Sequence, residues 1–303
     1  MSITSVLTDI VDDPKSSAFT RLQALSNLTD EQQVEFNQTW STLTIENRRR
    51  IAAWLDELAE DDVQLNFDSV FIALLSDEDA VIRRDAIGAL WESRDWSLVN
   101  RFISLLGHDP DPEVRAAAAN ALGKFELAVE LESRHAEDAP AIDRALLASL
   151  MDEDEEPVVR RRALEALSTR SIPDVPIAIV DARSSDLHEL RLGAIFAMGR
   201  TFDERWLDDL IEALESSEPD IRFEALGALG ELEAESAVED IIPLLEDEDA
   251  EVQLAAVDAL GKIGGDDAKA ILRRYAGRPS ALQEAAIEAL AQAEFNEDPM
   301  TLG

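Results

Sequence analysis

The sequence predicts an all-α protein: a right-handed α-solenoid, in which antiparallel helix pairs stack into a superhelix. The first observation is a short motif of helix-forming residues that recurs seven times, most clearly as DPEVRAAAANALG at residues 111–123. The second is its spacing, since the central alanines of successive copies are 32, 45, 31, 31, 31 and 30 residues apart. A period near 31 in helical sequence is typical of solenoids, in which each repeat packs only on its neighbours.

Each repeat is expected to hold two helices, A and B, and the motif marks helix B. In the copy at 111–123, the apolar residues Val114, Ala118, Ala121 and Leu122 are spaced i, i+4, i+7 and i+8, which places them on one helix face. An alanine at the centre of that face lets helix backbones approach closely. The seven central alanines are Ala86, Ala118, Ala163, Ala194, Ala225, Ala256 and Ala286.

Helix A precedes helix B in each repeat, and its apolar residues are clearest over residues 98–106, 206–214 and 238–245. Prolines such as Pro112 and Pro219 fall at the turns, where a helix must stop or start. The acidic residues before each B helix have a local explanation, because carboxylates there cap free N–H groups and face the positive end of the helix dipole.

The N-terminal residues 1–65 lack the motif but are still helical in pattern. Three helices are expected there, over residues 16–28, 29–43 and 45–60. Thr29 followed by Gln32 has the form of a capping box. We interpret this region as a helical cap, which a repeat array needs in order to cover its first core face.

The repeat array is expected over residues 66–292. The single step of 45 residues places an irregular insertion near 125–144, which we expect to interrupt the regular stacking. Residues 293–303 are expected to be a frayed tail.

Composition limits the classes of partner. The net charge of −38 arises from 65 acidic and 27 basic residues, which argues against nucleic-acid binding because that requires basic side chains to replace phosphate counterions. Anionic membranes are disfavoured for the same reason, and no apolar run approaches the roughly 18 residues that span a bilayer. The N-terminus also lacks the features of a signal peptide. We therefore expect a cytoplasmic protein whose acidity serves solubility or attracts a protein partner with a basic surface.

The sequence offers no catalytic, cofactor-binding or metal site. It contains no cysteine, no G-x-S-x-G and no G-x-x-x-x-G-K-[ST], and its acidic runs do not match an EF-hand loop. The three histidines, His108, His135 and His188, fall in different parts of the chain, and His188 is interpreted as a polar turn residue. No cofactor is expected.

Charged residues recur at fixed places in the motif and predict a structural ladder between repeats. An arginine occupies the same motif position in five copies, and an aspartate lies six residues before the first three of these arginines. We expect the turn aspartates and B-helix arginines to form hydrogen-bonded pairs between neighbouring repeats. The residues are Asp77, Arg83, Asp109, Arg115, Asp154, Arg160, Arg191 and Arg222; glutamine replaces the arginine at Gln253 and Gln283.

The pattern D-x-x-V-R-x-x-A-x-x-A-L-G at this period resembles the short HEAT-like repeats of the phycobilisome-lyase type, over about residues 66–292. The resemblance implies an armadillo-like helical fold, shared by bilin lyase subunits, deoxyhypusine hydroxylase and bacterial scaffold proteins. The hydroxylase type holds two irons on several His-Glu pairs. This chain has one such pair, His188-Glu189, which cannot supply that ligand set.

One apolar stripe departs from the repeat pattern. The positions one and five residues after the motif arginine should point away from the repeat core, and they are polar or small in most copies. In the fourth to sixth copies they include Leu192, Phe196, Phe223 and Leu254. A contiguous exposed apolar patch often marks a protein interface; the alternative is that superhelical twist buries these residues against the next repeat. Trp91 and Trp96 are expected in the core or cap.

These observations favour a non-enzymatic scaffold or adaptor that binds a protein partner on its concave B-helix face, through Leu192, Phe196, Phe223 and Leu254. The alternative rests on the resemblance alone: a bilin lyase-like subunit, or a chaperone acting on a chromophore or protein substrate. Tyr275 is the only tyrosine, which limits what a bilin site could contain.

Overall fold

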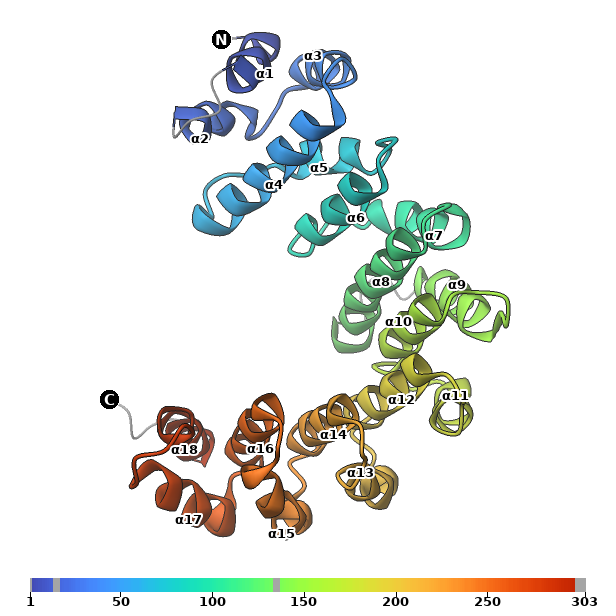
Figure 1. The fold of residues 1–303 in the computed structure, drawn as a ribbon. Coiled ribbons are helices and arrows are strands. Elements are labelled where there is room, and N and C mark those ends of the chain that lie inside the picture. Colours follow the sequence, from blue (N-terminus) through green and yellow to red (C-terminus); the bar gives the residue numbers. More distant parts are fainter. Residues whose placement is uncertain (1, 13–16, 133–136, 298–303) are drawn as a thin grey trace. The chain divides into compact units, whose positions relative to one another are not determined.

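The computed structural model describes residues 2–12, 17–132 and 137–297 (Figure 1). All regular structure in these ranges is helical, as the sequence predicts. The chain divides into two compact units, Met1–Phe125 and Glu126–Gly303. Within the described ranges, no helix has both the length and the apolar content needed to cross a membrane.

The first unit consists of short helices that pack in successive layers. They are α1 (Ile3–Asp12), α2 (Ser17–Leu22), α3 (Asp30–Trp40), α4 (Ile45–Asp61), α5 (Asp68–Leu74), α6 (Ala80–Ala89), α7 (Leu98–His108) and the first part of α8 (Pro112–Glu132), with a 3₁₀ turn at Gln23–Leu25. Helix α3 packs against α5, and α4 packs against α6. The α3–α4 pair therefore stacks on the α5–α6 pair as one repeat stacks on the next.

The second unit holds the last turns of α8 and five helix pairs. Its A helices are α9 (Ala139–Met151), α11 (Asp174–Arg183), α13 (Leu207–Ala213), α15 (Val238–Ile241) and α17 (Gly265–Ala276). Its B helices are α10 (Pro157–Leu167), α12 (His188–Arg200), α14 (Pro219–Glu231), α16 (Ala250–Ile263) and α18 (Gln283–Glu297). Three 3₁₀ segments extend the A helices: Glu204–Trp206, Glu235–Ala237 and Ile242–Glu246.

The B helices of the second unit lie next to one another along one side, and α11, α13, α15 and α17 lie along the other (Figure 1). We call the first side the B-helix face. The seven motif alanines lie at the centre of the packing, each no more than 2% exposed. Their burial shows why the motif requires a small residue there.

Glycines allow the closest approach between B helices. A Cβ atom added to Gly199 on α12 would lie 2.7 Å from the Cα atom of Ala228 on α14. A Cβ added to Gly261 on α16 would lie 2.9 Å from the Cβ atom of Ala289 on α18. Both distances are shorter than a Cβ atom tolerates to a non-bonded carbon. The final glycine of the motif, together with the central alanine, therefore sets the spacing of the repeats.

The N-terminal region contains more structure than the sequence predicts. The capping box is confirmed, since the Thr29 hydroxyl accepts from the Gln32 N–H and the Gln32 side chain accepts from the Thr29 N–H. Helix α1 was not expected, although its buried residues Ile3, Val6, Leu7 and Ile10 form a helical face.

The insertion in the repeat pattern lengthens one helix. Helix α8 has 21 residues, whereas α6 has 10 and α10 has 11. His135 and the rest of residues 133–136 lie outside the described residues. At the other end, α18 continues to Glu297, within the segment 293–303 for which we expected fraying, and residues 298–303 lie outside the described part.

Candidate functional site

The B-helix face of the second unit carries two exposed apolar side chains of the expected stripe. Phe223 on α14 is 46% exposed and Leu254 on α16 is 47% exposed, and these two helices are packed neighbours. Phe196 on α12 is half-buried. The exposed part of the stripe is therefore centred on α14 and α16.

Leu192 departs from the expectation, because it is only 6% exposed. Its helix, α12, packs between α10 and α14, and a long side chain from α10 lies over it. The Cγ atom of Arg161 lies 3.1 Å from where a Cβ of Gly193 would be, and its guanidinium reaches Glu189 at 3.0 Å and Glu224 at 3.8 Å. Leu192 is thus part of the inter-repeat packing and not of the exposed surface.

Arg161 also organises the charged part of this face. It donates to buried Glu165 at 2.6 Å, and Arg162 donates to the other oxygen of Glu165 at 2.6 Å. Burial raises the pKa of Glu224 above its ordinary value, while Arg161 acts in the opposite direction. Charged side chains therefore gather on α10 and α12, and the exposed apolar side chains of the stripe lie on α14 and α16.

A groove of about 240 Å³ lies beside Leu254. Leu254 and Val257 of α16 form one wall, and Ala285 and Ala289 of α18 form the other. Carboxylates stand at its rim: Asp258, which pairs with Lys262 at 3.1 Å, and Glu288. The groove therefore combines an apolar floor with acidic edges.

The first unit has a comparable groove on its own B helices, and the sequence did not indicate it. It encloses about 330 Å³ and is lined by Asp56 of α4, residues of α6 and residues of α8. Trp91 lies at its edge and is 55% exposed, so the expectation that it belongs to the core or cap is wrong. It follows the last turn of α6, where the core-facing position is taken by Leu90. Trp96 instead packs edge-on against Phe125, with ring centroids 5.0 Å apart.

The arginines of the motif link neighbouring repeats. Arg83 donates to both carboxylate oxygens of Asp109, each at 2.7 Å, and to the carbonyl oxygen of Asp77 at 2.8 Å. In the second compact unit, Arg222 makes the same set of bonds: to Asp247 at 2.7 and 2.8 Å and to the Ser216 carbonyl at 2.8 Å. Each arginine thus holds its own turn through a carbonyl and the next turn through a carboxylate. The hydrogen bonds from Arg222 hold the pKa of Asp247 below its ordinary value.

Other members of the ladder vary this arrangement. Arg115 donates to the carbonyl of Asp109 at 2.8 Å, and Arg191 donates to the carbonyl of Ser185 at 3.2 Å and to Glu218 at 3.0 Å. Ser216 occupies the place in this turn that Asp109 occupies in its own turn, six residues before the next motif arginine. Glu218 therefore supplies the carboxylate that pairs with Arg191.

Arg160 reaches the Leu150 carbonyl at 3.0 Å, since its turn is two residues longer. In that turn Asp152, and not Asp154, accepts from the N–H two residues later, as Asp77 and Asp109 do. Asp154 is exposed.

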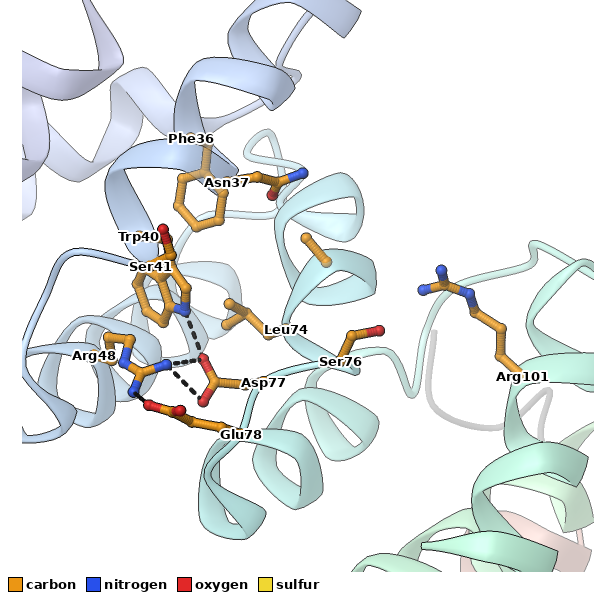
Figure 2. A pocket seen from close by; sticks show the side chains of 11 residues that line it. Phe36, Asn37, Trp40, Ser41, Arg48, Leu74, Ser76, Asp77, Glu78 and Arg101 are labelled. Carbon is orange, nitrogen blue, oxygen red and sulfur yellow. Dashed lines mark hydrogen bonds and ion pairs between the residues drawn. The ribbon is translucent and has the colours of Figure 1, made fainter.

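The ladder begins one repeat earlier than the motif does. Arg48 of α4 donates to both oxygens of Asp77, at 3.0 and 2.9 Å, and also to Glu78 (Figure 2). The indole of Trp40 donates to Asp77 at 2.7 Å, and Arg48 is 5% exposed. These residues line a pocket of about 460 Å³ in the first unit, and Arg101 stands on its opposite side (Figure 2). The sequence signal for this extra repeat is an arginine four residues after the helix-capping Thr44, the spacing that also separates Asp79 from Arg83.

His188 lies at the only group of three potential metal ligands found among the described residues. Its Nδ1 is 2.7 Å from Glu218 and its Nε2 is 2.6 Å from Asp220, and one ligand atom from each residue lies within 4.8 Å of the others. Both ring nitrogens face carboxylates and Arg191 also contacts Glu218, so the group links the start of α12 to the start of α14.

The sequence matches the family model of HEAT repeats over residues 68–168, 175–239 and 207–291. No curated protein matches it. Solved structures of similar fold include the Escherichia coli protein YibA, with 16% identity, 93% of this chain and 97% of that chain covered and a TM-score of 0.51.

Two further structures are similar. One is the complex of CpcE and CpcF of phycocyanin lyase from a Nostoc species, with 20% identity, 88% and 95% coverage and a TM-score of 0.54. The other is yeast importin-beta, with 11% identity, a TM-score of 0.55 and coverage of 98% of this chain and 47% of the other. At these identities the likeness is one of fold. Since the family model covers most of the sequence, the chain belongs to the HEAT-repeat family.

Proposed function

We propose that this protein is a non-enzymatic scaffold or adaptor, and that it binds a protein partner on the B-helix face of its second unit. The observation that supports this most directly is the exposure of Phe223 and Leu254 on adjacent B helices. Phe223 and Leu254 are each nearly half exposed, and Leu254 also lines a groove. An aromatic and an aliphatic side chain in this arrangement resemble the anchor positions of protein interfaces.

The surroundings of these side chains indicate the chemistry of the partner. Asp258 and Glu288 border the groove, and the chain carries a net charge of −38. A partner segment with apolar side chains flanked by lysine or arginine would satisfy both features, because opposite charges steer association and fix its register. Nucleic acid and anionic membranes do not fit this surface, and a cytoplasmic location is consistent with the lack of cysteine.

The experiment uses the full chain as bait in lysate of the native host, followed by binding measurements with the purified partner. The variant Phe223→Ser/Leu254→Ser should weaken binding by tenfold or more, since each apolar group that is buried contributes on the order of 1.5 kcal/mol or more. Ile242→Ser is the matched control, because Ile242 is 40% exposed but belongs to the A-helix side.

Thermal melting and circular dichroism show whether each variant is folded. Loss of partner capture by the double variant at unchanged melting temperature, with the control intact, supports the proposal. Equal capture by the double variant and the wild type would contradict it. If the double variant unfolds, the two residues are packing residues and the proposal is also wrong.

A further inference from the structure

A pocket of about 590 Å³ lies at the end of the helices of the second unit, away from the exposed stripe on the B-helix face. One wall is the extension of α8, with Leu127, Glu130 and Leu131. The turn after α10, residues 168–173, and the turn after α12, residues 200–203, form the others. The extra residues of the 45-residue step thus build a wall that the shorter B helices lack. Pockets for small molecules commonly enclose about 300–1,000 Å³.

The walls are joined by a network of charged groups around Arg170. This arginine donates to Glu130 of the α8 extension at 2.7 Å and lies 2.9 Å from Glu126 and 3.4 Å from Asp143 of α9. The hydroxyl of Ser171 donates to Glu130 at 3.2 Å. Glu126 is fully buried, so its contact with Arg170 is shielded from water, whereas the bonds to Glu130 lie nearer the surface. Together these contacts hold the α8 extension against the turn. The pocket is therefore preformed.

Two large apolar side chains line the pocket and are exposed, so they are not part of the core. Leu131 is 75% exposed and Phe202 is 66% exposed. Phe202 has a φ of 51°, in the left-handed region that a bulky residue rarely adopts. After α14, a polar residue, Glu233, takes a similar backbone conformation. An aromatic ring held there in solvent provides a surface for an apolar ligand.

The lining of the pocket carries one more basic than acidic residue. The basic residues are Arg170, Arg200 and Arg205, and the acidic residues are Glu130 and Asp203. Arg170 is neutralised by the network above, and Arg205 by Asp203 at 2.5 Å. Arg200 has a longer contact, 3.5 Å to Glu231, which also pairs with Lys262 at 3.1 Å. Because this contact is longer than those of Arg170 with Glu130 and of Arg205 with Asp203, the guanidinium of Arg200 is the most available of the three to an incoming anion.

The hydroxyl groups of the lining do not compete for this role. Those of Ser168 and Thr201 donate to the backbone carbonyls of Glu165 and Met198, at 2.6 and 2.8 Å. With their hydrogens engaged, they can only accept. The hydroxyls of Thr169 and Ser171 donate to the Ala166 carbonyl and to Glu130, which leaves the guanidinium of Arg200 as the side-chain donor we assign to an anion.

From these features we infer that the pocket binds a small amphipathic anion, with its acidic group paired to Arg200 and its apolar body between Leu131, Ile172 and Phe202. A single carboxylate attached to an apolar chain or ring has this chemistry. The site is separate from the protein-binding surface proposed above, so either can fail without the other.

The test titrates the full chain with the fluorescent anion 8-anilinonaphthalene-1-sulfonate and, in parallel, with the neutral N-phenyl-1-naphthylamine. Arg200→Gln should weaken binding of the anionic dye about tenfold, as expected for loss of a charge-assisted hydrogen bond, and leave the neutral dye unaffected. Arg200→Lys should retain much of the affinity. Leu131→Ser should weaken both dyes, and Phe223→Ser, outside the pocket, should weaken neither.

Competition identifies the acidic group as a carboxylate. Decanoate should displace the bound anionic dye at concentrations where decanol does not. Unchanged affinity of Arg200→Gln for the anionic dye, or of Leu131→Ser for both dyes, would overturn the inference, as would displacement by decanol as effective as by decanoate. Melting curves of each variant accompany the titrations, and if Leu131→Ser unfolds, Leu131→Gln replaces it with the same expectation.

Discussion

Arg83 and Asp109 lie 26 residues apart in the sequence and are joined by two parallel hydrogen bonds of 2.7 Å, with both side chains less than a tenth exposed. The bonds cross from the α5–α6 pair to the turn before α8. Shielding from water makes such a pair sensitive to the loss of either partner, because the remaining charge is buried without compensation.

Asp109→Ala should therefore lower the free energy of unfolding by about 3–5 kcal/mol. Denaturation by urea measures the loss. The matched control is Asp85→Ala, since the Arg84–Asp85 pair comes from the same helix but is 44% exposed on both sides. The control should change stability by less than about 1 kcal/mol. Similar losses in the two variants would mean that burial does not set the strength of the pair.

The contact between α12 and α14 gives a second prediction. Gly199→Ala places a methyl group 2.7 Å from the Cα atom of Ala228, and the helices must move apart to relieve the overlap. We expect a loss of about 1–3 kcal/mol in thermal or chemical unfolding.

Gly227→Ala is the control for this substitution. It lies within α14, and a Cβ atom there meets nothing within 4 Å, so replacing glycine in a helix should stabilise by up to about 1 kcal/mol. A neutral Gly199→Ala would show that the repeats are not spaced by this contact.

Glu126 should make stability depend on pH. Burial, reinforced by the carboxylates of Asp143 and Glu130 and opposed by Arg170, raises its pKa to about 8. The folded state then keeps a proton that the unfolded state releases above its ordinary value of 4.5, so stability decreases as pH rises between these values and levels off above about 8. The slope for one such group approaches about 1.4 kcal/mol per pH unit.

The measurement compares urea midpoints of the wild type and Glu126→Gln at pH 5.5, 6.5, 7.5 and 8.5. The glutamine side chain cannot lose a proton, so the variant should show a flatter profile and a stability advantage that grows toward pH 8. Parallel profiles for the two proteins would show that Glu126 is ionised in the folded state.

Added salt should raise the melting temperature. With 65 acidic and 27 basic residues, like charges repel across the folded surface, and at 1 M ionic strength the Debye length falls to about 3 Å. Melting curves in dilute buffer and in about 1 M KCl test this. A melting temperature that does not respond would indicate that caps and ion pairs already balance the charge.

The sequence predicted the helix pairs because their packing is local and repetitive. The seven motif alanines, from Ala86 to Ala286, mark the buried face of the B helices that carry the motif. Their regular spacing along the chain indicates that the helix pairs stack. Helices over residues 29–43 and 45–60 were predicted, and α3 and α4 lie there. The sequence did not show that this pair stacks as a further repeat, because Ile51, and not alanine, occupies the position near the centre of α4, although Arg48 follows the rule of the ladder.

The surface was harder to predict, because exposure depends on side chains from other repeats. Leu192 and Phe223 occupy equivalent positions in the motif, yet Leu192 is 6% exposed and Phe223 is 46% exposed. The pocket beside α8 could be predicted only if the position of the inserted residues in the fold were known. No periodicity indicates that residues 127–131 continue one helix and meet turns about 40 and 70 residues later in the chain.

The charged ladder ends at Asp247, since the next motif positions are Gln253 and Gln283. Gln253 donates to the carbonyl of Asp247 at 2.5 Å and Gln283 to that of Ala276 at 3.1 Å, so each amide holds its own turn but cannot form an ion pair with the next. The last helix pairs are therefore coupled to the array by packing alone at this position. Unfolding should begin there and proceed toward the N-terminus, and backbone amides of α17 and α18 should exchange their hydrogens for deuterium before those of α14.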